Sequence, residues 1–118
     1  MGMTNVRQLK VWVKAHEVVK AVYRLTLSYP REERYSLVDQ MRRAAVSIPS
    51  SICEGFIRAG AKDKGRFYNI GRASAEELKY YLYLSKDLGY IQSSDAVDGQ
   101  LDEVCAMLHR LWESVLRG

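Results

Sequence analysis

The chain has 118 residues, of which 47% are hydrophobic and 27% are charged, and its formal net charge is +4. This length fits one domain, residues 1–118, that buries a core without disulfide bonds, and the apolar content excludes intrinsic disorder. The positive charge favours an acidic partner such as nucleic acid, although many proteins without a polyanionic partner carry a similar charge.

The cysteines and the chain start indicate the compartment. Cys53 and Cys105 lie far apart and outside any CxxC pattern, which is typical of small buried side chains in a reducing environment. No run of 18 apolar residues is present, and residues 1–6 lack the apolar core of a signal peptide. We therefore expect a cytoplasmic protein with no membrane partner.

Four long segments repeat apolar residues at helical spacing, and none alternates as a strand does. The predicted helices cover about residues 9–28, 36–58, 62–88 and 94–116. The first ends at Tyr29-Pro30, because the residue before a proline avoids helical geometry. Short connections between helices of similar length predict an all-α, antiparallel up-down-up-down four-helix bundle.

Pro49 lies inside the second predicted helix. An interior proline costs about 3 kcal/mol and frees the carbonyl four residues earlier, here that of Ala45. Either the helix continues with a kink or it splits near Ile48. The apolar stripe keeps its phase across the proline, which favours a kinked helix. The serines available to satisfy loosened backbone groups are Ser47, Ser50 and Ser51.

The third predicted helix is apolar over more than one face. Its core face is assigned to Phe67, Ile70, Gly71, Ser74, Leu78, Tyr81 and Leu88. Tyr80 and Leu84 widen the apolar surface, which indicates burial against another subunit. The alternative is that the tyrosines cover the bundle with their hydroxyls in water.

No catalytic pattern is present. His16-Glu17 is followed by Lys20 where a zinc protease motif requires histidine, and Ala106 precedes His109 where a di-iron bundle requires glutamate. Adjacent carboxylates such as those of residues 76 and 77 diverge by about 100° on a helix and do not converge on a substrate. We expect no enzyme activity, no cofactor and no metal site.

The second predicted helix has a polar stripe beside Arg42. Its members are Asp39, Arg43, Ser47, Ser50, Glu54 and Arg58. The pairs Asp39–Arg43 and Glu54–Arg58 have ion-pair spacing. The stripe is either a solvated face or, where part of it is buried, a ligand groove or a subunit interface. The candidate interface residues are Asp39, Arg43, Ser47, Ser50, Glu54, Tyr80 and Leu84.

A basic stretch spans residues 58–72, interrupted by one acid, Asp63. Its cations are Arg58, Lys62, Lys64, Arg66 and Arg72. They are candidates for contacts with nucleic-acid phosphates, with Arg42 and Arg43 as a second group. The alternative is an ordinary set of solvated helix ends.

The order of several motifs resembles that of the 23S ribosomal RNA intervening-sequence proteins. The most specific is YSLVDQMRRAAVSIPSSICEG at residues 35–55, and LKVWVKAH at 9–16, FYNI at 67–70, SAEEL at 74–78 and LGYI at 88–91 also match. The chain departs from the family pattern at Ser51, usually asparagine, and at Cys53, usually alanine. Gly71 and Ala73 stand where the family usually has alanine and then glycine.

This resemblance implies a four-helix bundle with Pro49 inside its second helix, assembled as a homopentamer around a central channel. It also implies kinship with the accessory variability determinant of diversity-generating retroelements, a pentamer that binds reverse transcriptase and nucleic acid. The implied partners are copies of this chain, RNA or DNA, and a protein such as a reverse transcriptase.

Together these features predict a non-enzymatic, oligomeric accessory protein. We expect it to bind nucleic acid, RNA in the first place, electrostatically and with little sequence specificity. The alternative is a protein–protein interaction scaffold that does not bind nucleic acid.

Overall fold

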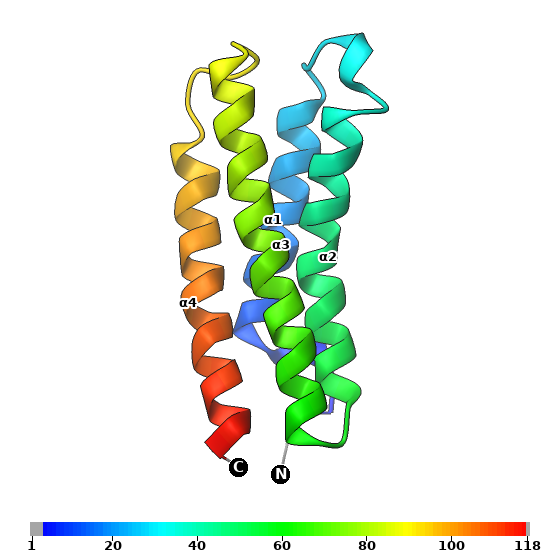
Figure 1. Ribbon diagram of the computed structural model, residues 1–118, viewed down its shortest axis with the longest axis vertical. Coiled ribbons are helices and arrows are strands. Elements are labelled where there is room, and N and C mark those ends of the chain that lie inside the picture. The colour runs from blue at the N-terminus through cyan, green and yellow to red at the C-terminus, as the bar shows by residue number, and fades with distance from the viewer. Residues whose placement is uncertain (1–3, 118) are drawn as a thin grey trace.

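The computed structural model describes residues 4–117 and forms an elongated bundle of four helices. The helices are α1 (Lys10–Thr26), α2 (Leu37–Ile57), α3 (Ala61–Asp87) and α4 (Asp95–Arg117), with short 3₁₀ turns η1 (Val6–Gln8) and η2 (Arg31–Glu33). Each helix packs against the next, and α4 packs back on α1 (Figure 1). The predicted all-α up-down bundle is confirmed, and every helix boundary lies within two residues of its predicted position.

The core is built from one stripe of each helix. On α1, Val11, Ala15, Val18 and Val22 are buried at spacings of three and four residues. The corresponding residues of α4 are Val97, Leu101, Val104 and Leu108. Burying a large aliphatic side chain stabilises a fold by about 1.5–3 kcal/mol, so these stripes hold the bundle together. None of the helices described is both long and apolar enough to cross a membrane.

Pro49 does not interrupt α2, which runs continuously from Leu37 to Ile57. The alternative of a split near Ile48 is therefore wrong. Ile48 and Pro49 are both buried, so the apolar stripe does pass through the proline as predicted. The nearby serines do not repair the backbone. The Ser47 hydroxyl instead meets the Ser74 hydroxyl of α3 at 2.8 Å.

The core face of α3 differs from the predicted one. The buried residues are Gly65, Tyr68, Gly71, Ala75, Leu78, Leu82 and Ser85. Ile70 and Leu88 were assigned to the core but are 39% and 49% exposed, whereas Tyr68 is 2% exposed. The physical reason is a close approach to α2, where a Cβ on Gly55 would lie 2.5 Å from Cε1 of Tyr68. The ring of Tyr68 thus occupies the space that a side chain at Gly55 would fill.

The loops at the end of the bundle opposite the α2–α3 turn are joined by polar and aromatic contacts. The rings of Tyr29 and Tyr90 lie 5.3 Å apart, and the Tyr90 hydroxyl donates to Glu33 Oε2 at 2.6 Å. The Ser36 hydroxyl donates to Glu33 Oε1 at 2.6 Å. Hydrogen bonds from Ser36 and then Tyr90 lower the pKa of Glu33. Gly89, whose φ is +80°, allows the chain to leave α3 toward this contact.

Candidate nucleic-acid and subunit interfaces

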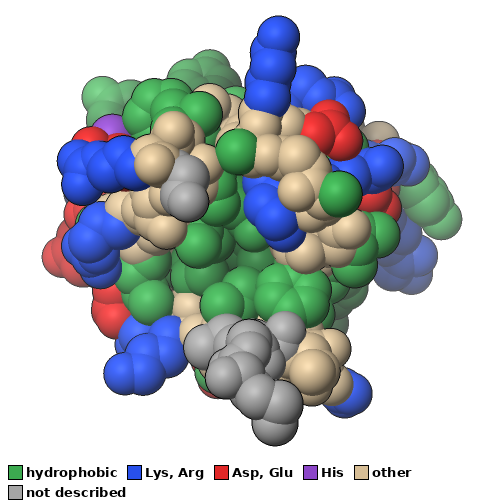
Figure 2. Space-filling view, turned by 90° about the horizontal axis from the view of Figure 1, so that it is seen from below, with side chains coloured by type: hydrophobic (Ala, Val, Ile, Leu, Met, Phe, Trp, Pro, Cys, Tyr) green, Lys and Arg blue, Asp and Glu red, His purple; other side chains and the backbone are tan. Residues whose placement is uncertain are grey.

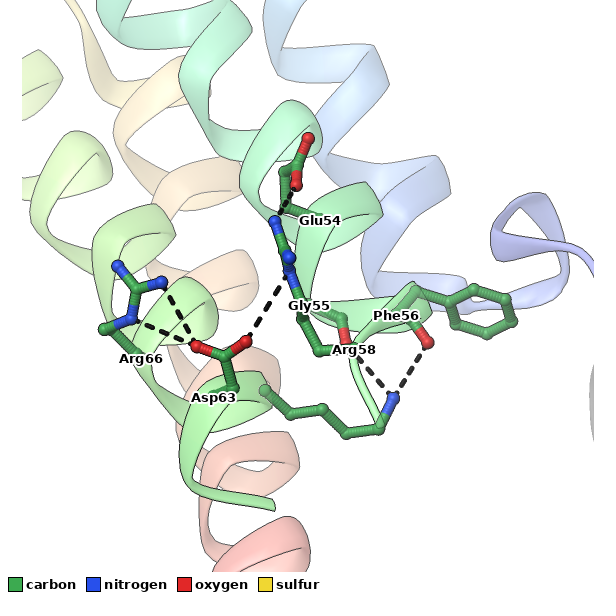
Figure 3. A network of polar contacts seen from close by, with 7 residues as sticks. Glu54, Gly55, Phe56, Arg58, Asp63 and Arg66 are labelled. Carbon is green, nitrogen blue, oxygen red and sulfur yellow. Dashed lines mark hydrogen bonds and ion pairs between the residues drawn. The ribbon is translucent and has the colours of Figure 1, made fainter. Parts of the chain in front are cut away.

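The predicted basic stretch begins at the α2–α3 turn, where ion pairs with two carboxylates join the end of α2 to the start of α3. Arg58 Nη2 donates to Glu54 Oε2 at 2.7 Å, and Arg58 Nε lies 3.7 Å from Asp63 Oδ2 (Figure 3). Arg66 Nη2 donates to the other oxygen of Asp63 at 3.1 Å. Arg58 and Arg66 are therefore tied to acids of the same turn, which reduces the charge that they present to a ligand.

Lys64 has a structural role that its charge alone did not indicate. Its ammonium group donates to the carbonyls of Gly55 at 3.1 Å and Phe56 at 2.8 Å, in the last turn of α2 (Figure 3). Carbonyls at the end of a helix lack partners within the helix, and a cation there also interacts favourably with the helix dipole. Lys64 therefore caps α2 and is only partly available to a ligand.

Lys62 and Arg72 keep their charge without a carboxylate partner. Neither forms an ion pair with any residue between positions 4 and 117. Arg72 Nη1 donates to Asn69 Oδ1 at 3.1 Å, and its guanidinium lies 5.8 Å from the ring centroid of Trp112. These two cations are the members of the predicted set that are electrostatically most available.

An aromatic ring lies within this basic region. The guanidinium groups of Arg58 and Arg66 lie 4.6 and 4.4 Å from the ring centroid of Phe67. Stacking on an aromatic face holds a guanidinium plane in position while leaving some of its N–H groups free. Around this end of the bundle, Lys and Arg side chains surround a hydrophobic centre (Figure 2).

The polar stripe of α2 contains two ion pairs, whereas the neighbouring Arg42 points away from it. Arg43 Nε donates to Asp39 Oδ2 at 2.8 Å, so the predicted ion pairs Asp39–Arg43 and Glu54–Arg58 are both present. Arg42 turns instead toward α1, where its Nε donates to Thr26 Oγ1 at 3.0 Å. An open groove runs beside this part of α2. It is lined by Tyr23, Asp39, Arg42, Arg43, Val46, Ser47 and Ser50.

The α3 flank predicted as a subunit interface is partly exposed. Tyr80 is 59% exposed, and Leu84 is half-buried and packs on the core. The adjacent Tyr81 hydroxyl donates to Gln40 Oε1 of α2 at 3.4 Å. The contacts Ser47–Ser74 and Gln40–Tyr81 therefore lie between α2 and α3, whereas Tyr80 is left on the outside.

Ser51, one of the departures from the family pattern, is 5% exposed and lies at the contact between α2 and α3. A Cβ on Gly71 would lie 3.6 Å from the Ser51 Cβ and 3.4 Å from Leu108 Cδ1, which are ordinary contact distances. Serine at this position thus affects helix packing rather than the open groove.

The other titratable side chains make packing contacts and hydrogen bonds within the bundle. Among residues 4–117, no group of three or more His, Cys, Asp or Glu side chains is placed to hold a metal ion. His16 stacks on Trp12 at 5.2 Å between ring centroids. Burial raises the pKa of the Cys105 thiol, which disfavours the reactive thiolate. Lys79 donates to Asp102 and Glu76, and these bonds raise its pKa to about 12.

The fold and these surfaces define a small all-α bundle whose α2–α3 end is rich in cations. The family model of the 23S rRNA-intervening sequence protein matches residues 7–110. The chain therefore belongs to the 23S rRNA-intervening sequence protein family, as its motifs predicted. A search of curated proteins finds no match.

Proposed function

We propose that this chain is a non-enzymatic, self-associating accessory protein that binds nucleic acid, RNA in the first place, through the cations around the α2–α3 turn. The observation that carries the proposal is an excess of positive charge. Arg58, Lys62, Lys64 and Arg66 stand there against the two carboxylates of Glu54 and Asp63, and Arg72 lies further along α3. Membership of a family named for an insert in ribosomal RNA is consistent with an RNA partner.

Lys62 and Arg72 would make the strongest phosphate contacts, because neither forms an ion pair within the described residues. Arg58 and Arg66 would contribute less, since each already shares Asp63. Phosphate contacts fix a nucleic acid in place but carry no sequence information, so the binding would have little sequence specificity. Arg42 and Arg43 remain second-rank candidates on α2.

Self-association would multiply this modest charge. In a homopentamer, the assembly implied by the family resemblance, each copy of the basic end adds a binding point. Several weak contacts on one RNA then bind together with an affinity well above that of a single copy.

The proposal is tested by fluorescence anisotropy with a structured RNA and a duplex DNA over a range of salt concentrations. We expect binding that weakens steeply with salt, because cations that neutralise phosphates release counterions. Replacing Lys62 and Arg72 together by glutamine should weaken binding to all sequences alike. The slope of log affinity against log salt concentration should also become shallower, by about one unit for each phosphate that is no longer neutralised.

The matched control replaces Lys14 and Lys20 by glutamine. Both lie on α1 and are paired, with Glu103 and Glu17, so the change in net charge is the same but the location differs. This variant should keep nearly all of the affinity. An unmodified protein that binds neither nucleic acid at low salt would contradict the proposal.

A second function, that of a protein–protein scaffold, is favoured by one feature of α3. Tyr80 and Tyr83 are 59% and 65% exposed, and exposed aromatic side chains are common in protein interfaces. In this alternative the α3 flank and the α2 stripe hold copies of the chain or a protein partner such as a reverse transcriptase.

Light scattering coupled to gel filtration tests the scaffold. Replacing Tyr80 and Leu84 by glutamate should give a folded monomer. The control is Val13→Glu on α1, where the native side chain is 44% exposed. An oligomer that survives the Tyr80 and Leu84 changes would place the interface elsewhere.

A further inference from the structure

A second basic site lies at the other end of the bundle, where α1 passes into α2. An open pocket of about 180 Å³ is present there. Its lining residues are Thr26, Leu27, Tyr29, Pro30, Arg31, Arg34, Val38 and Arg42. Three of them are arginines, and they come from two different elements, the loop around η2 and the second turn of α2.

Arg42 is held in a fixed orientation in this pocket. Its Nε donates to Thr26 Oγ1 at 3.0 Å, its Nη2 donates to the Tyr23 carbonyl at 3.4 Å, and its guanidinium lies 4.4 Å from the Tyr23 ring centroid. Thr26 is 3% exposed, and its own hydroxyl donates to the Val22 carbonyl at 2.8 Å, so it is free to accept from Arg42. Among residues 4–117, no acceptor is provided for Arg42 Nη1.

Arg31 and Arg34 are placed on the same side of the chain by local geometry. They lie three residues apart around η2, and the Arg34 amide donates to the Arg31 carbonyl at 3.1 Å. Residues i and i+3 of a 3₁₀ turn are eclipsed, so their side chains leave the turn in the same direction. Neither guanidinium hydrogen-bonds or pairs with another residue in the described part of the chain.

No carboxylate is among the residues that line the pocket. Glu33 is engaged by Ser36 and Tyr90, and Asp39 is engaged by Arg43. Glu32 is the remaining acid of the turn; it is exposed and pairs with no residue between positions 4 and 117. Glu32 and Glu33 keep their charge in the loop, but the pocket itself is lined by three arginines and by no acid.

The carbonyl oxygens at the end of α1 could repel a bound anion, but hydrogen bonds cover them. Those of Tyr23, Arg24 and Thr26 already accept from Arg42, Leu27 and Tyr29. The negative end of the α1 dipole is thus covered by hydrogen bonds. Arg42 is held in position with its Nη1 group unengaged, and Arg31 and Arg34 keep their N–H groups free in the described part of the chain, so the three side chains together can donate charge-assisted hydrogen bonds to one phosphate.

We infer that Arg31, Arg34 and Arg42 form a binding site for a phosphate group, distinct from the α2–α3 end. The group is either a phosphodiester of a nucleic-acid backbone or a free phosphate, including the terminal phosphate of a nucleotide. The inference goes beyond the proposed function, because the site lies at the opposite end of a bundle 47 Å long and shares none of the five cations of the α2–α3 turn.

The test is NMR of the full ¹⁵N-labelled chain, titrated with inorganic phosphate at constant ionic strength, with chloride as the reference ion. The Nε–H resonances of Arg31, Arg34 and Arg42 should shift and reach saturation with phosphate but not with chloride. Changes that do not saturate, or that spread equally over all arginines, would overturn the inference.

Variants make the assignment specific. Arg34→Gln should raise the phosphate dissociation constant by at least about tenfold, because it removes a charge-assisted hydrogen bond. The matched control is Arg117→Gln, which removes an exposed guanidinium on α4 that is paired with Glu113. Arg34 is exposed, so the variant should fold, and its amide spectrum checks that it does. Equal losses of affinity in the two variants would contradict a discrete site.

Competition then identifies the source of the phosphate. An oligoribonucleotide without a terminal phosphate that displaces inorganic phosphate indicates the nucleic-acid backbone. Displacement only by 5′-phosphorylated compounds indicates a nucleotide or free phosphate. If the unmodified protein binds no RNA but phosphate still saturates these resonances, the proposed function fails and the phosphate site stands. If the protein binds RNA but phosphate does not saturate these resonances, the phosphate site fails and the proposed function stands.

Discussion

Both ends of the bundle carry several cations, but their cations have different partners. At the α2–α3 turn, Arg58, Lys64 and Arg66 are tied to carboxylates or helix carbonyls, and only part of the charge remains available. At the α1–α2 turn, Arg31 and Arg34 have no partner within the described chain, and Arg42 is held by neutral groups. The number of cations in a segment is therefore a poor measure of its charge toward a ligand. The partners of each cation decide it.

The strongest effect on the α2–α3 end should come from its helix packing. Gly55→Ala should lower the free energy of unfolding by about 1–3 kcal/mol, because its Cβ would lie 2.5 Å from the buried ring of Tyr68. Chemical denaturation measures the loss. Gly71→Ala is the control, since its Cβ meets only ordinary contacts at 3.4 Å or more. That change should be neutral or stabilising by up to about 1 kcal/mol, the difference in helix propensity. Equal destabilisation by both substitutions would contradict the close packing of Tyr68 on Gly55.

A weaker effect is expected from the cap on α2. Lys64→Met keeps the aliphatic stem but removes the two hydrogen bonds to the Gly55 and Phe56 carbonyls. We expect a loss of about 1 kcal/mol, the usual value for a helix-end interaction of this kind. Lys62→Met is the matched control and should change stability by less than about 0.5 kcal/mol, as for an ordinary surface position. If the two variants are equally stable, Lys64 is not a cap and its charge is free for a ligand.

These differences show which features can be predicted from the sequence. The stripes of α1 and α4 were predictable because large aliphatic residues recur there at helical spacing. The face of α3 was predicted only in part. Gly71 and Leu78 were assigned to it and are buried, but Gly65 and Ser85 are buried by close helix packing and carry no hydrophobic signal. Phe67 was expected in the core, but its ring is contacted by the guanidinium groups of Arg58 and Arg66 instead.

Some contacts of the candidate site could likewise be predicted from the sequence, and others could not. The pairs Asp39–Arg43 and Glu54–Arg58 follow from their four-residue spacing, which places both partners on one helix face. The contact of Arg58 with Asp63 and the cap by Lys64 depend on how the chain turns between α2 and α3, which spacing within a helix does not encode. The position of Arg31 and Arg34 near Arg42 likewise depends on how the η2 loop folds against α2. Its one local signal is the three-residue spacing in the loop.

The weakest effect concerns the loop contact at the α1–α2 end. Tyr90→Phe removes the hydrogen bond to Glu33 and should lower the melting temperature slightly at neutral pH. Because the folded-state pKa of Glu33 is lowered below 4.5, its contribution is present above that pH and is lost as the pH falls through the folded value. The difference between the unmodified protein and the variant should therefore shrink on acidification. A difference that is constant down to the lowest pH would show that the carboxylate of Glu33 is not involved.

Cations without carboxylate partners are the groups that we propose bind the phosphates of a nucleic acid. The decisive experiment is the salt dependence of RNA affinity in the Lys62→Gln/Arg72→Gln variant, compared with the Lys14→Gln/Lys20→Gln variant of equal net charge. We predict a weaker affinity and a flatter slope for the first variant only, by about one unit of slope for each phosphate no longer neutralised. Identical curves for the two variants would contradict the proposal, because net charge rather than the unpaired cations at the α2–α3 end would then determine binding.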